Sequence, residues 1–349
     1  MTPEPAAETF ATPNPVLVRA WRGDILENAH RGAIAIANAR GELIESWGAV
    51  AHPMLPRSSY KILQALPLVE SGAAEAHGLS PAELALACAS HNGAAIHTEP
   101  VSAWLARLGL GEQNLICGVQ RPQDRPAREA LDAAGAAPSQ LHNNCSGKHA
   151  GFLTLATRLG APIGDYIDPG HPVQKAAAAA ISEMSGHDAT LAYGVDGCSA
   201  PNFAVPLRGL ATAMARVADP SGLGTARSAA AVRLREAMAA HPALIAGEGR
   251  ACTDFIRAVE AASGPGAAVC KTGADGVFTA ILPGRGLGVA LKIDDGATAA
   301  AEAVMAALLV RLGAAPSEDP RIGGRASKPI INRRRLEVGR LEAVEFGQI

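Results

Sequence analysis

The sequence contains no long hydrophobic run and no marked excess of charge of either sign. No segment reaches the roughly 18–20 consecutive apolar residues of a membrane-spanning helix, so a membrane protein is not expected. The net charge of −2 at pH 7 argues against a broad nucleic-acid-binding surface. The first residues, MTPEPAAETFATPNP, have neither a basic start nor an apolar core. We therefore expect no signal peptide and predict a cytoplasmic protein.

Lysine is also scarce, because the chain has six lysines against 25 arginines. One of them lies in LPRSSYKILQALP, residues 55–67, three positions after Ser58. Residues with this spacing share one face of a helix. A neutral lysine amine can take a proton from a serine, whereas arginine cannot, and this needs the lysine pKa to fall by about 3 units. The spacing therefore makes Lys61 a candidate general base for Ser58.

Strand-like patterns occur near both ends of the chain, and helical patterns fill the middle. PVLVRAWRG and GAIAIANARGELIESWG predict an early antiparallel pair, and GAAVCKTGADGVFTAILPGRGLGVALKIDDG predicts three late strands. We predict an α/β fold, a sheet flanked by helices, with the functional site in a cleft. Residues 1–14 would form a disordered or extended tail, and 15–349 a single catalytic unit. Its sheet part would comprise 15–57 and 263–349, with a mainly helical subdomain, 58–262, inserted between them.

Two further short motifs extend the serine–lysine pattern. Ser90 belongs to SHN at 90–92, and Lys271 to KTG at 271–273 after an apolar strand. The order Ser-x-x-Lys, Ser-x-Asn, Lys-Thr-Gly is the motif set of serine β-lactamases and penicillin-binding proteins. A second lysine in the cleft would lower the pKa of Lys61 and attract an anionic part of the substrate.

Two cysteine-containing segments suggest a metal site. HNNCSGKHAGF, residues 142–152, contains Cys145, and GVDGCSAPNFAVP, residues 194–206, contains Cys198. Two thiolates and a nitrogen donor suit zinc. The spacing leaves three candidates for the nitrogen ligand open, and buried free thiols are the alternative reading. The three candidates are His142, Lys148 and His149.

Together, PRSSYK, CASHNGAAIH, HNNCSGKHAGF, GVDGCSAPNFAVPL and KTGADGVF resemble the rhizobial-type, or thermolabile, L-asparaginases. The resemblance extends from about residue 15 to the C-terminus. It implies a fold like that of serine β-lactamases and glutaminases, and a homodimer that hydrolyses L-asparagine to L-aspartate and ammonia. It further implies the serine–lysine pairs Ser58–Lys61 and Ser90–Lys271. One zinc ion per chain, not strictly required for turnover, would be bound by Cys145, Lys148 and Cys198, with Asp196 nearby.

The resulting hypothesis is an L-asparaginase with a serine nucleophile activated by lysine. A serine glutaminase is the nearest alternative, since substrates that differ by one methylene are hard to discriminate. A β-lactamase or peptidase would share the chemistry. A non-catalytic, zinc-stabilised binding module would need the cysteines but neither serine.

Overall fold

The computed structural model describes residues 13–188 and 192–346, so nearly all of the predicted tail, 1–14, lies outside the described residues. The strands are β1 (Val16–Arg22), β2 (Ile25–Asn38), β3 (Leu43–Trp47), β4 (Pro53–Met54), β5 (Tyr193–Val195), β6 (Pro201–Phe203), β7 (Val205–Pro206), β8 (Val269–Thr272), β9 (Val277–Leu282), β10 (Leu287–Ile293), β11 (Ser327–Ile331) and β12 (Glu337–Ala343).

The α-helices are α1 (Lys61–Glu70), α2 (Ala73–Ala76), α3 (Pro81–Ala87), α4 (Ala95–Arg107), α5 (Arg125–Ala134), α6 (Ser146–Leu159), α7 (Pro172–Ser185), α8 (Leu207–Ala218), α9 (Thr225–Ala240), α10 (Pro242–Ile245), α11 (Ala251–Ser263), α12 (Thr298–Arg311) and α13 (Pro320–Ala326). Short 3₁₀ turns are η1 (Arg57–Tyr60), η2 (Glu112–Asn114), η3 (Gln140–His142), η4 (Pro220–Gly222) and η5 (Pro283–Arg285). No helix in these described ranges is both long and apolar enough to cross a membrane.

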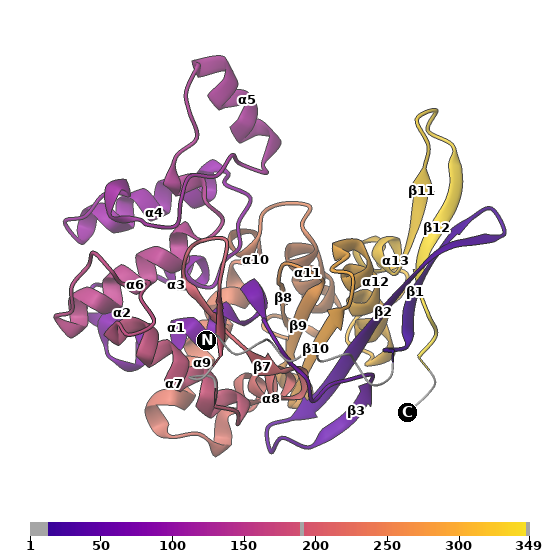
Figure 1. The fold of residues 1–349 in the computed structure, drawn as a ribbon, viewed down its shortest axis with the longest axis horizontal. Helices are drawn as coiled ribbons and strands as arrows, with labels where there is room; N and C mark the ends of the chain where they lie inside the picture. The colour runs from indigo at the N-terminus through magenta and orange to yellow at the C-terminus, as the bar shows by residue number, and fades with distance from the viewer. Residues whose placement is uncertain (1–12, 189–191, 347–349) are drawn as a thin grey trace, which may run out of the picture.

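Strands from both ends of the chain form one antiparallel sheet, as predicted. Its order is β11-β12-β1-β2-β10-β9-β8, with β3 also paired to β2. Strand β2 joins its two parts, because residues 25–31 pair with β1 and residues 32–38 with β10. Figure 1 shows this sheet on one side of the molecule and most helices on the other. The α/β fold class is confirmed, while the limits of the sheet and helical parts stay a prediction.

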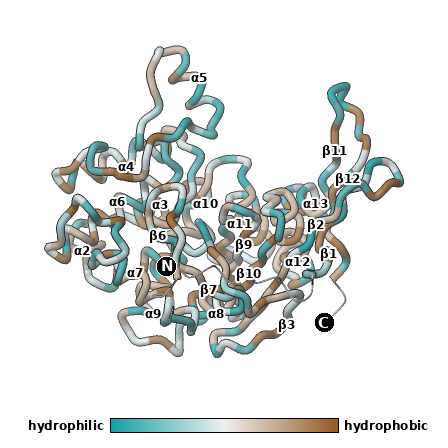
Figure 2. The backbone as a smooth tube through the Cα atoms, viewed as in Figure 1, coloured by the Kyte–Doolittle hydropathy of each residue, from teal (hydrophilic) through white to brown (hydrophobic). Residues whose placement is uncertain are grey.

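Strands β9 and β10 and the second half of β2 are mostly apolar because helices cover both faces of the sheet there. Successive residues Val289, Ala290 and Leu291 of β10 point to alternate faces, and all three are fully buried. Helix α8 packs on β2, β9 and β10, while α12 packs on β1, β9, β10 and β12. Figure 2 shows apolar residues concentrated in these strands and a more polar α5, whose side chains are not buried. Two helices of the predicted inserted part, α8 and α11, thus pack on the sheet, α11 on β8.

Two local features of the helical part decide where site residues lie. A capping box, whose Ser-x-x-Glu pattern can be seen in the sequence, begins α3, since the Ser80 side chain accepts the Glu83 N–H and the Glu83 carboxylate accepts the Ser80 N–H. Helix α3 ends at Ala87, so Ser90 lies in a loop. The start of α6 comes so close to α3 that a Cβ on Gly147 would lie 2.3 Å from the Leu86 carbonyl oxygen. Only glycine fits this contact, which places the start of α6 beside the Ser90 loop.

Candidate active site

Ser58 lies in η1, one turn before the buried Lys61, which begins α1. The sheet holds this segment through its neighbour Ser59. The Ser59 hydroxyl donates to the Pro56 carbonyl at 2.7 Å, and the Ser59 carbonyl accepts the Thr279 hydroxyl of β9 at 3.0 Å. Ser58 is therefore presented from the junction between the helical part and the sheet.

The Lys61 amine makes its hydrogen bonds with groups from other segments of the chain. Its Nζ lies 3.0 Å from Ser90 Oγ and 3.1 Å from Cys145 Sγ, and it also donates to the Ala89 carbonyl. Among the described residues no hydrogen bond joins the side chains of Ser58 and Lys61. The structure therefore links Lys61 directly to the second motif serine, Ser90, rather than to the first.

Backbone contacts fix the loop that carries Ser90. The Ser90 N–H donates to the Ile245 carbonyl at 2.8 Å, and the His91 N–H donates to the Asn144 carbonyl at 3.2 Å. The Asn92 side chain donates to Asp124 at 3.3 Å and accepts the Ala94 N–H at 3.3 Å. Asn92 of the Ser-x-Asn motif thus stabilises the loop. Among the described residues, its side chain forms no hydrogen bond with Lys61 or Lys271.

Lys271 lies on β8, and burial is the main feature of its environment. Its amine donates to the Thr272 carbonyl at 2.9 Å, and no recorded hydrogen bond in the described chain joins it to Ser90. Burial, with smaller contributions from the positive charges of Lys61 and Arg250, lowers the pKa of Lys271 to about 7. Lys271 can therefore exchange a proton near neutral pH.

A close backbone contact joins β8 to the serine segment. A Cβ on Gly273 would lie 2.6 Å from the Pro56 carbonyl oxygen and 3.2 Å from the Ser59 nitrogen. Glycine at this position of the Lys-Thr-Gly motif therefore permits the contact. The end of β8 and the segment that carries Ser58 lie side by side for this reason.

The three predicted metal ligands lie close together. Cys145 precedes α6, Lys148 occupies its first turn, and Cys198 lies between β5 and β6. The Lys148 Nζ is 3.0 Å from the Cys198 sulfur. A hydrogen bond from Cys145 lowers the pKa of Cys198 against the effect of burial, and Lys148 lowers it further. Burial opposes charge on Lys148, but the two sulfurs outweigh it and raise the pKa of Lys148.

The residues of this cluster fit a zinc ion by their chemistry. Two thiols and an amine are donor types that zinc accepts, and the amine would have to lose its proton on binding. In the described ranges no three His, Cys, Asp or Glu side chains form a metal site, so zinc binding by Cys145, Lys148 and Cys198 stays a prediction. Of the two histidines left open by the spacing, His142 accepts the Ser139 N–H at 3.0 Å, and His149 Nδ1 lies 2.7 Å from the Tyr166 hydroxyl.

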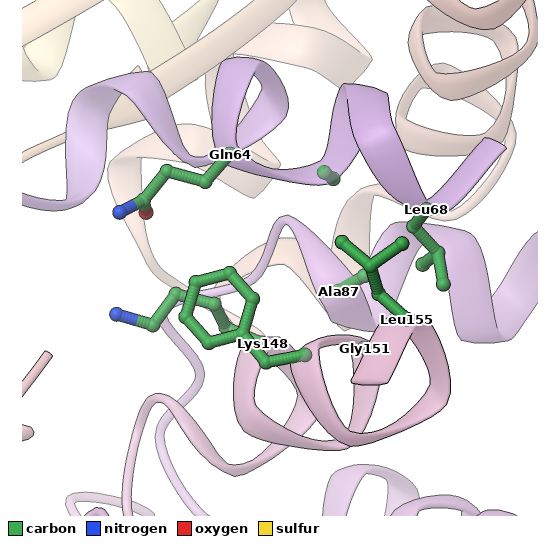
Figure 3. A pocket seen from close by; sticks show the side chains of 8 residues that line it. Gln64, Leu68, Ala87, Lys148, Gly151 and Leu155 are labelled. Carbon is green, nitrogen blue, oxygen red and sulfur yellow. The ribbon is translucent and has the colours of Figure 1, made fainter. Parts of the chain in front are cut away.

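A small cavity lies beside the cluster. Figure 3 shows Gln64 of α1 and Lys148 of α6 with their polar ends on one side of it, and apolar side chains, including Leu68 and Leu155, on the other. Its volume is about 10 Å³. That is about the space needed for one water molecule. The cavity is therefore too small to accept a substrate.

Comparison with known proteins decides the family. The sequence profile of L-asparaginase II matches residues 18–343. The chain belongs to the L-asparaginase II family. The family prediction made from the motifs is thereby confirmed, and family membership supports an amidohydrolase. No curated protein sequence matches the chain.

The solved structures that this L-asparaginase II family member resembles are distant. A β-lactamase from Mycobacterium bovis is 14% identical, with 80% of this chain and 94% of that chain covered and a TM-score of 0.41. Mglu in its glutamate form is 15% identical, with coverages of 87% and 66% and a TM-score of 0.45. A class C β-lactamase mutant is 13% identical, with coverages of 78% and 90% and a TM-score of 0.39. At these values the likeness carries no argument about function.

One group of polar residues at the site of this family member was not assigned a role from the sequence. Arg57 Nε donates to Asp196 at 3.0 Å, and the other edge of its guanidinium bonds to Asp275. The Asp196 carboxylate, expected near the metal ligands, thus has Arg57 as its ion-pair partner. All three residues lie inside the quoted motifs. Their pairing gave no local signal, because Arg57 is 139 and 218 residues from its two partners.

Proposed function

We propose that this protein is an L-asparaginase that hydrolyses L-asparagine to L-aspartate and ammonia through a serine nucleophile. One observation carries the proposal. In a chain of the L-asparaginase II family, a buried lysine one turn after Ser58 has its amine 3.0 Å from the hydroxyl of Ser90. A buried amine beside a serine hydroxyl is the arrangement that activates serine for attack on an amide.

In the acylation step Lys61 exchanges its hydrogen bond with Ser90 for one with Ser58, and it acts as general base while Ser58 acts as nucleophile. Lys61 takes the hydroxyl proton while Ser58 Oγ bonds to the side-chain amide carbon of asparagine. The proton passes to the amide nitrogen, the C–N bond breaks, and ammonia leaves a β-aspartyl ester on Ser58. Water then adds to the ester carbon, and its proton passes through Lys61 to Ser58 as the C–O bond breaks and L-aspartate is released.

Two further groups support these steps. Backbone N–H groups at Ser58 and after Lys271 stabilise the negative oxygen of the tetrahedral adduct. Ser90 and Lys271 form the second pair, which relays a proton toward the departing ammonia. The pKa of Lys271, lowered to about 7 chiefly by burial, suits proton exchange at neutral pH.

Cys145, Lys148 and Cys198 would hold one zinc ion per chain. When bound, zinc supplies a fixed positive charge that orients the substrate and shapes the cleft. The catalytic steps assigned to Ser58 and Lys61 do not pass through it. The homodimer and the cytoplasmic location also stay predictions.

The first experiment measures ammonia release by the purified protein from L-asparagine, with L-glutamine in parallel. We expect release from asparagine and little from glutamine. Equal or faster release from glutamine would identify a glutaminase, and turnover of a chromogenic β-lactam alone would identify a β-lactamase-like hydrolase. No turnover of any of the three by folded protein would contradict the proposed function and favour a binding module.

A further inference from the structure

Strained backbone conformations gather at the candidate site. Among the described residues, four that are not glycine have positive φ, and three of them, Arg57 (54°), Ser199 (69°) and Asp275 (55°), belong to the site motifs. Such conformations are unfavourable and persist where the surrounding structure holds them, often at ligand-binding positions. Two of the three residues, Arg57 and Asp275, form an ion pair with each other. The backbone is therefore held in a way that places these two charges together.

The two edges of the Arg57 guanidinium have different kinds of partner. One edge lies on Asp196, at 3.0 Å from both Nε and Nη2. The Asp196 carboxylate is itself held by the Gly197 N–H at 2.8 Å and the Asn202 amide at 3.4 Å. The other edge, Nη1, lies on Asp275. Only 13% of the Asp196 side chain is exposed, against 65% of that of Asp275. Asp196 is thus a fixed partner and Asp275 an exchangeable one.

This ion pair lies at the rim of the reaction site. Arg57 immediately precedes Ser58, and Asp275 follows Lys271 in the turn between β8 and β9. The close approach of Gly273 to Pro56 and Ser59 joins the two segments. A quarter of the Arg57 side chain is exposed, so a ligand can reach its guanidinium. The pair therefore presents one positive and one negative group next to the proposed nucleophile.

We infer that Arg57 and Asp275 bind the charged head group of an α-amino acid substrate. This inference rests on the proposed function and adds how the substrate is recognised. The α-carboxylate takes the place of Asp275 at Arg57 Nη1, and the released Asp275 carboxylate accepts the α-ammonium group. Exposed ion pairs contribute little to stability, so exchanging partners costs little. Asp196 keeps the guanidinium in place throughout, and such preorganisation favours binding.

Head-group recognition predicts selection for free amino acids. An asparagine inside a peptide has neither charge at its α-carbon, so it would leave Arg57 and Asp275 unmatched. Two small substrates separate the charges. 3-Aminopropanamide is asparagine without the α-carboxylate, and succinamic acid is asparagine without the α-ammonium group.

The test compares kcat/KM for L-asparagine and these two analogues in Arg57→Gln and Asp275→Asn proteins. Loss of a charge-assisted hydrogen bond should lower kcat/KM for asparagine about 10- to 100-fold in each variant. Arg57→Gln should leave kcat/KM for 3-aminopropanamide within about threefold of wild type, and Asp275→Asn should do the same for succinamic acid. Arg22→Gln, which removes an exposed ion pair with Glu27 in the β1–β2 hairpin, is the control. Equal losses for asparagine and for the matching analogue would overturn the inference, because the residue would then act on structure.

Binding of L-aspartate, measured by calorimetry, separates this inference from the proposed reaction. If wild-type protein releases no ammonia but binds aspartate, and Arg57→Gln weakens that binding at least about tenfold, the head-group site stands and the proposed function fails. If wild-type protein binds no aspartate, or if Arg57→Gln binds it as tightly as wild type, the head-group site is wrong whatever the activity.

Discussion

Lys148 and Lys271 are equally buried, each with 3% of its surface exposed, yet their pKa values shift in opposite directions. Burial lowers the pKa of Lys148, but the nearby Cys198 sulfur, with a smaller contribution from Cys145, outweighs burial and raises it. Lys271 has a backbone carbonyl as its hydrogen-bond partner and the positive charges of Lys61 and Arg250 nearby, and its pKa falls to about 7. The difference in pKa between the two lysines therefore comes from their neighbouring groups and not from how deeply they are buried.

This difference assigns different chemistry to the two sides of the site. On the thiol side the Lys148 amine lies close to the Cys145 and Cys198 sulfurs, an arrangement that suits a metal ion or a fixed charge. On the β8 side an amine that loses its proton near neutral pH suits proton transfer. Lys61 lies between them, because its amine contacts both Ser90 and Cys145.

The largest expected effect comes from Lys61→Arg. Arginine keeps the positive charge but cannot act as a base at neutral pH, so kcat should fall about 10⁴- to 10⁶-fold. Steady-state ammonia release from L-asparagine measures this. Lys175→Arg on the exposed face of α7 is the matched control and should retain full activity. An active Lys61→Arg enzyme would exclude the base role.

A serine pair tests which hydroxyl attacks. Ser58→Ala should lower kcat about 10⁴- to 10⁶-fold, as loss of a nucleophile does. Ser90→Ala should cost less, about 10²- to 10⁴-fold, if Ser90 only relays a proton. Single-turnover ammonia release by the two variants gives the comparison. Our assignment is wrong if Ser58→Ala keeps most of the activity and Ser90→Ala does not. The hydrogen bond between Lys61 and Ser90 would then explain why Ser90 is the nucleophile.

The third prediction concerns pH. Burial favours the neutral form of Lys271, so its amine is protonated below about pH 7 and free above it. If the neutral amine takes part in proton transfer, kcat/KM should rise with pH through about 7, and Lys271→Met should remove that rise with a loss of about 10²- to 10⁴-fold. Lys292→Met is the control, because burial also lowers the pKa of Lys292 but this residue lies on β10, outside the site. An unchanged inflection in Lys271→Met would assign the titration to another group.

Substitutions of the two cysteines should have the smallest effect on turnover, because the proposed catalytic steps do not pass through the metal. Cys145→Ser and Cys198→Ser should each reduce bound zinc from about one ion per chain to nearly none, because each removes a ligand. Elemental analysis of protein prepared without chelators measures this. Cys88→Ala removes another buried thiol and should keep the metal. Metal-free wild-type protein prepared in the same way would contradict the zinc prediction.

Local patterns in the sequence predicted those parts of the molecule that depend on neighbouring residues. The Ser80–Glu83 capping box and the three late strands follow from spacing and alternation, and the structure has all of them. The β11–β12 hairpin did not, because β11 is largely exposed, β12 is only half-buried, and neither strand shows a regular apolar alternation. The loop that carries the Ser-x-Asn motif also has no local signal in the sequence, since α3 ends at Ala87 and backbone contacts from distant segments fix the residues after it.

Within the site, the motifs identified residues but not their partners. The bond between Lys61 and Ser90 joins positions 29 residues apart, and that between Lys148 and Cys198 joins positions 50 apart. The resemblance grouped Lys148 with the cysteines, and the structure places them together. The Arg57–Asp275 ion pair could not be predicted from the sequence, because nothing in PRSSYK indicates which carboxylate lies beside its arginine.

The pairing of β1 with β12 has a consequence for folding during synthesis. Strands β1 and β2 pair with each other, but Val18 of β1 also lies opposite Ala343, and residues 32–38 of β2 also pair with β10. These second partners exist only when nearly the whole chain has been made. Until then β1 and β2 would expose open strand edges, which favour pairing with other chains. The helical segments between them make more local contacts and can form earlier. Chains truncated before β10 should therefore aggregate while retaining helical structure, and a ribosome that pauses late would produce the same species.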